Sequence, residues 1–373
     1  MFHLIFGIPW LVVVIRFIQP LPWIWPAKAS LAMLLLVASQ FHLVSRLSSG
    51  SVFDPEFSRP LVIAFNVLFG AIVLLAVFQI ALDVVSLAII PFKGGFPSAP
   101  AGLRYGIGFL AIGLSAYGVN QAISVPPLND IEIAIAGLSP EFDGYRLIQL
   151  TDLHISRLFP AAWTKEVVSR TNALDADLIV ITGDFIDGDV AHRKDDVAPL
   201  WGLRARDGVY AIPGNHEYFF DYQEWMRHLE MLGMRMLSNS HVVLKRGNAE
   251  IVLAGVNDLS ARGHGAPPPD LAAAIKGAPA NTPILLLDHQ PMMAEKAAAS
   301  GVALQLSGHT HGGMIPGLDR LIARANGGFV SGRYQIGAMT LYVNNGTALW
   351  PGFALRLGIP SELTSITLRA RTK

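Results

Sequence analysis

Residues 308–313 read Gly-His-Thr-His-Gly-Gly, and the interpretation of the whole chain starts from this stretch. Its two histidines are one residue apart, so an extended or tightly turned backbone places both imidazoles on the same side. A two-metal site needs further ligands from elsewhere in the sequence. The chain has no cysteine, so those ligands must be imidazole, carboxylate or amide groups.

Four earlier clusters contain groups of these kinds, and each follows a short apolar run. They are Asp152-Leu153-His154, Gly183-Asp184-Phe185-Ile186-Asp187, Gly214-Asn215-His216-Glu217 and the isolated His289. Taken singly, such clusters are more typical of a turn, a helix cap or a hydrogen-bonded histidine than of a metal site. Taken together, and in this order, they favour a metal site.

The apolar runs predict short buried strands from residue 131 onward. The predicted strands cover residues 131–136, 146–150, 178–181, 209–212, 251–254, 284–287 and 302–306. Residues 162–172 and 222–232 predict helices between some of these strands, which indicates an α/β domain. Five strands lead directly into a cluster, and ligands in α/β folds gather at the carboxyl ends of strands.

The order of the motifs resembles that of the calcineurin-like metallophosphoesterases. The motifs are Asp-x-His, Gly-Asp-x-x-Asp, Gly-Asn-His-Glu, a lone histidine and Gly-His-x-His. Residues 309–313 and the ending Tyr342-Val343-Asn344, with Pro360-Ser361-Glu362 after it, resemble the YkuE-like membrane-associated subgroup. The resemblance covers roughly residues 130–370 and implies a four-layer α/β/β/α sandwich, with two central sheets flanked by helices.

The resemblance also implies a set of metal ligands. It assigns Asp152, His154 and His311 to one ion, Asn215, His289 and His309 to a second, and Asp184 to both. Two divalent ions ~3.5–4 Å apart clamp a phosphoryl group and activate the attacking water. Imidazole, carboxylate and amide ligands suit Mn, Fe or Zn better than Ca or Mg.

Three further residues receive roles from the same comparison. His216 is expected to be catalytic together with Asp184, by stabilising charge or protonating the leaving oxygen. Asp187 and Asp288 are expected to orient ligand histidines. For Asp288, a solvated acid at the end of a strand is an equal alternative.

Several side chains outside the motifs are candidate substrate contacts. Arg333 and the loop at residues 255–265 are hypothesised to reach a phosphate. Apolar residues follow three of the motifs, and they form either a rim for a lipid-linked phosphate or ordinary packing. These residues are Phe159-Pro160 with Trp163, Met292-Met293, and Met314-Ile315-Pro316.

The composition places part of the chain in a membrane. Its 373 residues are 52% hydrophobic and 15% charged, whereas soluble domains carry about 25% charged residues. Residues 126–373 hold 22 basic and 25 acidic side chains, a balance of −3. This acidic balance argues against a nucleic-acid partner.

The front of the chain predicts an all-α transmembrane region of about four helices. Its apolar segments cover residues 4–18, 31–47, 61–90 and 105–125. A span needs roughly 20 apolar residues, so the first segment is either a span, a re-entrant piece or an interfacial helix. A cleaved signal peptide is not expected, because no basic region precedes it. Asp83, in the third segment, marks either an intramembrane functional site or the point where the helix leaves the bilayer.

These features divide the chain into a multi-pass transmembrane region at residues 1–125, a linker at 126–140 and a metallophosphoesterase domain at 141–373. Lys28, Lys93 and Arg104 fall in the first and third loops, and Arg46 and Arg59 in the second. The positive-inside rule then favours a plasma (inner) membrane protein whose C-terminal domain is extracytoplasmic.

The leading hypothesis is a membrane-anchored phosphoesterase that acts on a phosphodiester or pyrophosphate in a lipid or lipid-linked sugar. The resemblance makes UDP-diacylglucosamine the first specific substrate to test. One alternative is a protein phosphatase that uses the same site. Another is a membrane sensor or transporter whose site only binds metal or a phosphorylated ligand.

Overall fold

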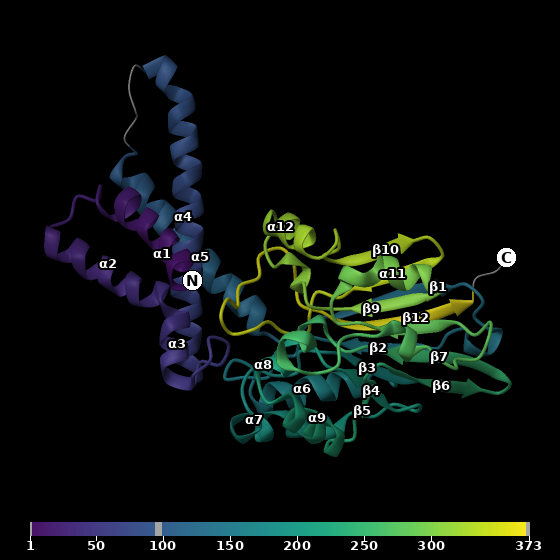
Figure 1. The fold of residues 1–373 in the computed structure, drawn as a ribbon. Helices are drawn as coiled ribbons and strands as arrows, with labels where there is room; N and C mark the ends of the chain where they lie inside the picture. The colour runs from purple at the N-terminus through teal and green to yellow at the C-terminus, as the bar shows by residue number, and fades with distance from the viewer. Residues whose placement is uncertain (1, 94–98, 371–373) are drawn as a thin grey trace. The chain divides into compact units, whose positions relative to one another are not determined.

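The computed structural model describes residues 2–93 and 99–370 and divides into two compact units. Unit 1 comprises Met1–Ala122 and Pro351–Leu355, and unit 2 comprises Ile123–Trp350 and Arg356–Lys373. Figure 1 shows unit 1 as helices and unit 2 as two sheets with flanking helices. Residues 94–98, in the predicted third loop, and residues 1 and 371–373, at the ends of the predicted domains, lie outside the described part.

Unit 1 consists of helices joined by turns and short loops, with the non-helical segment 351–355 added to it. Its helices are α1 (Phe2–Val13), the π-helix η1 (Val14–Ile18), α2 (Trp25–Ser39), α3 (Phe41–Ser49), α4 (Arg59–Lys93) and α5 (Ala101–Ile123). Only α4 and α5, among the described helices, are each long and apolar enough to cross a membrane. Helices α2 and α3 also pass that test if the pair, bent by 54°, counts as one span. The structure therefore has two or three candidate spans where the sequence predicts about four.

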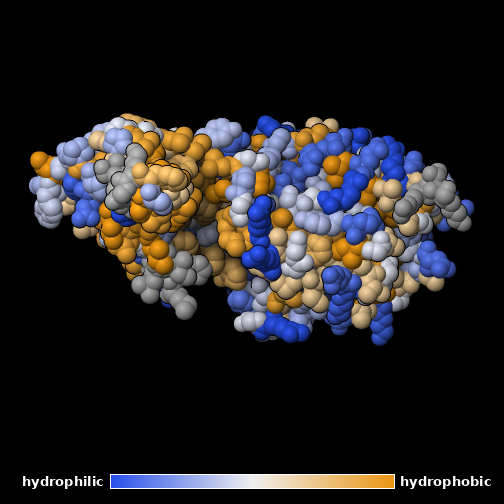
Figure 2. All heavy atoms as spheres, turned by 90° about the horizontal axis from the view of Figure 1, so that it is seen from above, coloured by the Kyte–Doolittle hydropathy of each residue, from blue (hydrophilic) through white to orange (hydrophobic). Residues whose placement is uncertain are grey.

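The surface of unit 1 is apolar, as expected for helices in lipid. Ile80, Val84 and Leu87 on α4 each expose more than half of their side chain, at 52%, 61% and 57%. Figure 2 shows hydrophobic side chains, in orange, gathered over the helical unit, whereas hydrophilic side chains dominate the surface of unit 2. The apolar exterior supports the assignment of unit 1 to a bilayer.

Asp83 has a partner within unit 1. Its carboxylate accepts hydrogen bonds from Arg16 Nε at 2.8 Å and Arg16 Nη2 at 2.6 Å, and from Gln79 at 3.3 Å. A carboxylate paired with an arginine in this way is stabilised in apolar surroundings. The structure thus pairs Asp83 with Arg16, and both sequence-based interpretations of Asp83 stay predictions.

Unit 2 contains two six-stranded mixed sheets. The first has the order β1-β12-β2-β3-β4-β5 and the second β10-β11-β9-β8-β7-β6. The first-sheet strands are β1 (Leu128–Ile135), β2 (Arg146–Leu150), β3 (Leu178–Thr182), β4 (Val209–Ile212), β5 (Arg235–Met236) and β12 (Leu363–Ala370). The second-sheet strands are β6 (Ser240–Arg246), β7 (Ala249–Gly255), β8 (Ile284–Leu287), β9 (Leu304–Ser307), β10 (Gly332–Ile336) and β11 (Met339–Val343).

The two sheets pack face to face over one apolar core. Leu147 and Val180 from the first sheet are fully buried in the same cluster as Leu253, Leu285 and Leu304 from the second. Strands buried on both faces read as continuous apolar runs, and for this reason the sequence predicts them well. The strand β1 lies within the stretch predicted as a linker, 126–140, and pairs in parallel with β12. This stretch is therefore part of the domain.

Helices cover the outer faces of the sheets and complete the predicted four-layer sandwich. They are α6 (Ala161–Asn172), α7 (Val190–Val197), α8 (Asn215–Phe219), α9 (Tyr222–Met231), α10 (Leu271–Ala274), α11 (Ala294–Ala299) and α12 (Leu318–Ala325). Short 3-10 turns are η2 (Pro140–Phe142), η3 (Ala198–Gly202), η4 (Leu259–His264), η5 (Pro291–Met293) and η6 (His311–Gly313). Ala274 of α10 and Ala294 of α11 pack against Leu286 and Val343, on the outer face of the second sheet.

Candidate metal centre

The seven candidate ligands follow the carboxyl ends of five strands. Asp152 and His154 follow β2, Asp184 follows β3 and Asn215 follows β4; His289 follows β8, and His309 and His311 follow β9. The strands β2, β3 and β4 are mutually parallel, as are β8 and β9, so within each sheet these ends share one edge. The ligands from the two sheets meet there, and six of the seven are buried, with His309 half-buried.

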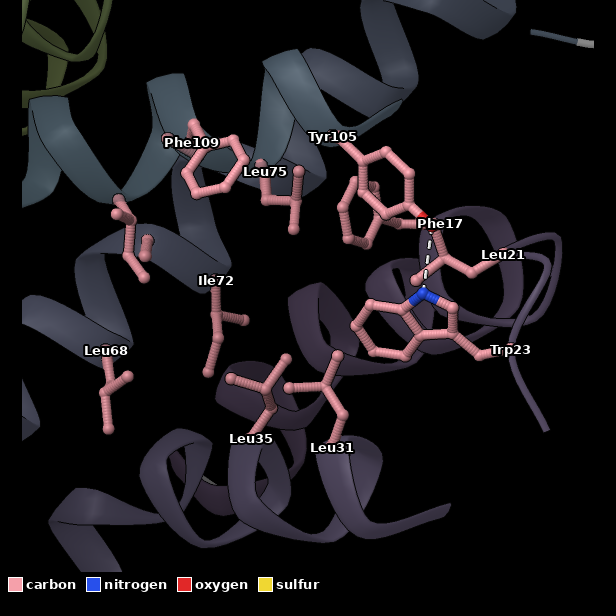
Figure 3. Close-up of a pocket in the computed structure, with 14 residues that line it drawn as sticks. Phe17, Leu21, Trp23, Leu31, Leu35, Leu68, Ile72, Leu75, Tyr105 and Phe109 are labelled. Carbon is pink, nitrogen blue, oxygen red and sulfur yellow. Dashed lines mark hydrogen bonds between the residues drawn. The ribbon is translucent and has the colours of Figure 1, made fainter. Parts of the chain in front are cut away.

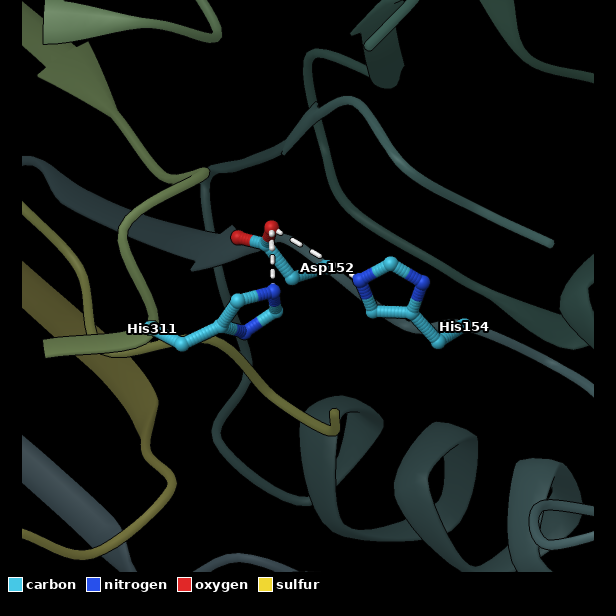
Figure 4. A group of neighbouring side chains, drawn as sticks. All are labelled: Asp152, His154 and His311. Carbon is cyan, nitrogen blue, oxygen red and sulfur yellow. Dashed lines mark ion pairs between the residues drawn. The ribbon is translucent and has the colours of Figure 1, made fainter. Parts of the chain in front are cut away.

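The first subsite consists of Asp152, His154 and His311. Asp152 Oδ1 lies 3.9 Å from His154 Nε2 and 3.6 Å from His311 Nε2. Figure 4 shows the carboxylate of Asp152 between the two imidazoles. Each of the three residues offers one ligand atom, and these atoms all lie within 4.8 Å of one another. Such a group could hold one metal ion.

The second subsite shares Asp184 with the first. His289 Nε2 lies 3.3 Å from Asp184 Oδ2 and 3.1 Å from Asn215 Oδ1. His309 Nδ1 lies 2.8 Å from the same Asn215 oxygen. Asp184 Oδ2 is also 3.7 Å from His154 Nε2, so this oxygen lies between the second subsite and a histidine of the first.

The residues present fit divalent metal ions. His154 Nε2 is buried and has no hydrogen-bond partner in the described structure, although it points at two carboxylates. Its other nitrogen, Nδ1, is 3.1 Å from Asp187 Oδ2, which fixes the tautomer that leaves Nε2 with a lone pair. A buried nitrogen without a partner is costly in a folded protein, and a metal ion would satisfy it.

The electrostatics of the cluster fit the same reading. Burial raises the pKa of Asp184, but the imidazoles of His289 and His216 outweigh it and hold that pKa well below its usual range. Burial lowers the pKa of His216, but Asp184 and Asp187 outweigh it and raise that pKa to about 9. The buried carboxylates thus favour positive charge in the centre, as a cation site requires.

The backbone is in an uncommon conformation at most of the ligands. Nine non-glycine residues in the described structure have positive φ, and five of them are the candidate ligands Asp152, His154, Asp184, His309 and His311. Left-handed backbone costs free energy at a residue with a side chain and persists only where the surroundings impose it. Here the fold imposes it at the turns that follow the strands, where it sets the direction of the ligand side chains.

Gly308 shows how closely these turns approach one another. A Cβ atom at this position would lie 2.2 Å from Thr151 Oγ1 and 2.3 Å from Asp152 Oδ2. We expect Gly308→Ala to displace Asp152 and to weaken metal binding about tenfold to hundredfold. Metal titration followed by calorimetry measures this loss. Gly263→Ala is the matched control, because a Cβ there meets no atom within 4 Å, and unchanged affinity in Gly308→Ala would contradict the proposed role of Asp152.

Comparison with known proteins agrees with the motifs and the fold. Residues 145–313 match the calcineurin-like phosphoesterase family. The uncharacterized metallophosphoesterase YkuE from Bacillus subtilis is 32% identical over 236 residues, which cover 61% of this chain and 80% of that protein. The chain belongs to the calcineurin-like metallophosphoesterase family. Its metallophosphoesterase domain therefore falls in a class of metal-dependent phosphoester hydrolases, as predicted.

Other relatives extend the match to proteins with membrane segments. A "transmembrane protein with metallophosphoesterase domain" from Danio rerio is 35% identical over 268 residues, which cover 69% of this chain. The chain spans 60% of the length of that relative and of its Bos taurus counterpart. Among solved structures, the sulfate thiohydrolase SoxB of Thermus thermophilus has a TM-score of 0.38 and 13% identity, and the match covers 60% of this chain and 56% of that one.

Asp187 holds two histidines of the metallophosphoesterase centre at once. One carboxylate oxygen contacts His154 Nδ1, and the other lies 2.5 Å from His216 Nδ1. His216 Nε2 therefore faces the centre, 3.9 Å from Asp184 Oδ2. His216 also forms a compact group with His154 and Asp184, so its position alone would allow metal binding.

Asp288 does not orient a ligand histidine through its carboxylate in this structure. The Nδ1 atom of His289 instead donates to the backbone oxygen of Thr182 at 2.7 Å, and the Asp288 backbone oxygen accepts from Ser307 Oγ at 2.6 Å. Burial, followed by the charge of Asp258, raises the pKa of Asp288 to about 8. The backbone oxygen of Thr182, in β3, thus orients His289, which is the role predicted for the Asp288 side chain.

The two hypothesised phosphate contacts differ in outcome. Arg333 is engaged elsewhere, because its Nη2 donates to the backbone oxygen of Glu132 on β1. The 255–265 loop does reach the neighbourhood of the centre. The ring of His264 lies 5.9 Å from that of Phe219, and Phe219 lies 5.1 Å from His216.

Two residues that position the ligand turns could not be assigned this role from the sequence. Glu217 is the last residue of the Gly-Asn-His-Glu motif, and Arg356 lies outside all the motifs. The buried carboxylate of Glu217 accepts hydrogen bonds from the backbone N–H groups of Asp184 at 3.1 Å, Phe185 at 2.7 Å and Gly214 at 2.7 Å. The buried guanidinium of Arg356 donates to the backbone oxygens of His311 at 3.0 Å and Asn345 at 2.6 Å. Each ties a ligand turn to a distant part of the domain.

Replacement of Glu217 by glutamine tests the first of these ties. An amide cannot accept from all three N–H groups, and its own NH₂ would face one of them. We expect a loss of about 2 kcal/mol in the free energy of unfolding and a tenfold to hundredfold loss of metal affinity. Denaturant unfolding and metal titration of Glu217→Gln, beside the exposed Glu230→Gln, measure both effects. Identical behaviour of the two variants would remove this role.

Proposed function

We propose that the protein is a membrane-anchored hydrolase of a phosphodiester or pyrophosphate bond, in a lipid or a lipid-linked sugar. The observation that carries this proposal is the pair of adjacent clusters of nitrogen and oxygen ligand atoms, with the Asp184 carboxylate near a histidine of each. The proposed metal ligands are Asp152, His154, Asp184, Asn215, His289, His309 and His311. They would hold two divalent ions, Mn, Fe or Zn by the nature of their ligand atoms.

When bound, the two ions supply Lewis acidity toward the phosphoryl group and activate water for the attack. The chain itself supplies positioning and a proton. Asp187 fixes His216 so that Nδ1 is occupied and Nε2 faces the centre. We assign His216 the protonation of the leaving oxygen, for which a positioned imidazole is well suited. Asp187 and Glu217 keep the centre in place between turnovers.

Two features support a lipid rather than a fully soluble substrate. The same chain carries α4 and α5, which are long enough to span a bilayer. Met292, three residues after His289, is 44% exposed, and Leu321 on α12, close after the His311 turn, is 61% exposed. The rim is smaller than the sequence suggests, because Phe159 and Trp163 are buried against each other.

A substrate panel tests the proposal. The purified full-length protein, with Mn²⁺ restored after chelation, would be assayed on UDP-diacylglucosamine, on the water-soluble analogue UDP-N-acetylglucosamine and on a phosphoserine peptide. We expect kcat/KM for the lipid pyrophosphate to exceed that for its soluble analogue by at least about tenfold, since buried apolar area adds binding energy. Fastest turnover of the phosphopeptide would instead favour a protein phosphatase.

We propose further that the protein is a multi-pass protein of the plasma (inner) membrane with an extracytoplasmic domain. If the bent α2–α3 pair counts as one span, Lys28, Lys93 and Arg104 still fall on one side and Arg46 and Arg59 on the other.

The absence of cysteine allows a direct test of this orientation. Ser300 is exposed, whereas Ser361 is only 2% exposed and unsuitable for labelling. We expect Ser300→Cys to react with an impermeant maleimide in intact cells, which would favour envelope lipids as substrates. Labelling only after lysis would contradict this orientation and make UDP-diacylglucosamine the prime candidate.

A further inference from the structure

Unit 1 contains an apolar cavity between its helices. Its volume is about 300 Å³, and η1, the following turn and helices α2, α4 and α5 all contribute to it. Figure 3 shows Leu35, Leu68 and Ile72 lining one part, with Trp23 and Tyr105 at the other. All fourteen lining residues are apolar, aromatic or glycine. The cavity opens to the surface of the helices, because its lining residues Phe109 and Ile112 are 77% and 48% exposed.

One end of the cavity carries its polar groups. Trp23 Nε1 donates a hydrogen bond to the Tyr105 hydroxyl at 2.9 Å, and the two rings stack with centroids 6.3 Å apart. Trp23 is 41% exposed, so this pair lies at the opening and not in the interior. Tryptophan and tyrosine with one apolar and one polar edge are typical of the level of lipid headgroups.

Cationic side chains gather at the same end. Arg16 directly precedes the lining residue Phe17, and Arg104 directly precedes Tyr105. Arg104 Nη1 donates to the Arg16 backbone oxygen at 2.6 Å, and Lys28 Nζ donates to the Gln19 backbone oxygen at 2.7 Å. Three cations therefore lie on the segments that form this end, and the carboxylate of Asp83 pairs with one of them, Arg16.

We propose that this cavity binds one acyl chain of an anionic glycerophospholipid, with the phosphate at the end formed by Trp23, Tyr105 and Arg104. An entirely apolar lining accepts hydrocarbon without leaving a polar group unpaired, and an excess of two positive charges at the opening complements a phosphate. The exposed apolar surface of α4 shows that hydrocarbon is the natural surroundings of these helices. Unit 1 is then a lipid-binding module as well as an anchor, whatever the domain hydrolyses.

A cavity-filling substitution with a matched control tests the proposal. Ala111 lines the cavity and is 1% exposed, whereas Ala116, on the same helix, is exposed and lies outside it. Native mass spectrometry of the full chain would count bound phosphatidylglycerol after detergent exchange. We expect one retained lipid in the wild type and in Ala116→Phe, and at least a tenfold weaker retention in Ala111→Phe. Equal retention in all three would overturn the proposal.

A second measurement does not depend on the folding of Ala111→Phe. The fluorescence of Trp23 is isolated by subtracting the signal of Trp23→Phe, with Trp25→Phe as control because Trp25 is 78% exposed. In nanodiscs, brominated phosphatidylglycerol is expected to quench Trp23 at least threefold more than brominated phosphatidylcholine, and Trp25 equally with both. Equal quenching of Trp23 by both lipids would overturn the proposal. So would a dimer that Ala111→Phe dissociates, because a second copy would then occupy the cavity.

Discussion

Asp184→Asn is expected to lower metal-dependent phosphoester hydrolysis by about 10³-fold. The Oδ2 atom of Asp184 lies 3.3 Å from His289 Nε2, 3.7 Å from His154 Nε2 and 3.9 Å from His216 Nε2. This one oxygen therefore lies near histidine nitrogens of both subsites. Loss of the shared charge removes several kcal/mol of transition-state stabilisation, and each 1.36 kcal/mol is tenfold in rate.

The asparagine variant separates this effect from unfolding. Asn keeps the side-chain shape. Its oxygen can still accept the hydrogen bond that the backbone N–H of His216 donates to Asp184 Oδ1 at 2.8 Å. The circular dichroism spectrum is therefore expected to match the wild type, while bound metal falls. Asp195→Asn, at an exposed position, is the control and should keep full activity. Wild-type turnover in Asp184→Asn would refute the shared-ligand assignment.

His216→Gln is expected to lower the rate by about 10²–10⁴-fold while bound metal stays at the wild-type level. The reason is that the proposed mechanism assigns the leaving oxygen to His216 and the ions to the seven ligands. The loss should depend on the leaving group. An alkyl phosphodiester needs a proton on departure and should show the full effect, but bis(4-nitrophenyl) phosphate releases a stable anion and should show far less.

Metal analysis and the two substrates together decide the role of His216. An equal loss on both diesters, with less bound metal, would make His216 a ligand, as its group with His154 and Asp184 allows. An equal loss with metal unchanged would assign it to charge stabilisation rather than protonation.

The sequence predicts the central strands and the candidate ligands together, because both follow from one pattern. A strand buried on both faces must be apolar, and it must end where polar side chains begin. The strands β2, β4 and β8 have the predicted bounds. The sequence does not predict the strands β5, β6 and β10–β12, because none of them leads into a cluster of candidate ligands and several alternate polar with apolar residues. The strand β12, for example, reads Leu-Thr-Ser-Ile-Thr-Leu-Arg-Ala.

The surroundings of the ligands are harder to predict than the ligands themselves. Glu217 reaches N–H groups 32 and 33 residues away, and Arg356 reaches an oxygen 45 residues away. Such contacts are set by how the turns of two sheets meet, and local pattern contains no information about that. Arg333 and Arg356 illustrate the limit. The exposed arginine was the expected functional one, but the buried one holds the His311 turn.

In the membrane region, too, the sequence predicts some features of the structure and leaves others open. Apolar length predicts α4 and α5 directly. The bend of 54° between α2 and α3 and the pairing of Asp83 with Arg16 depend on packing, so the sequence left both open. Residues 351–355 cluster with unit 1 although they lie far from it in sequence, and only the folded chain reveals this.

The most direct test of the central claim is a metal titration of the full-length protein with two readouts. The protein is stripped with a chelator, Mn²⁺ is added back in steps, and bound metal and hydrolysis of bis(4-nitrophenyl) phosphate are measured on the same samples. We predict no turnover without metal and full turnover at two ions per chain, with both lost in Asp184→Asn. Turnover by the metal-free protein, or saturation at two ions without any turnover, would contradict a metal centre that carries out phosphoester hydrolysis.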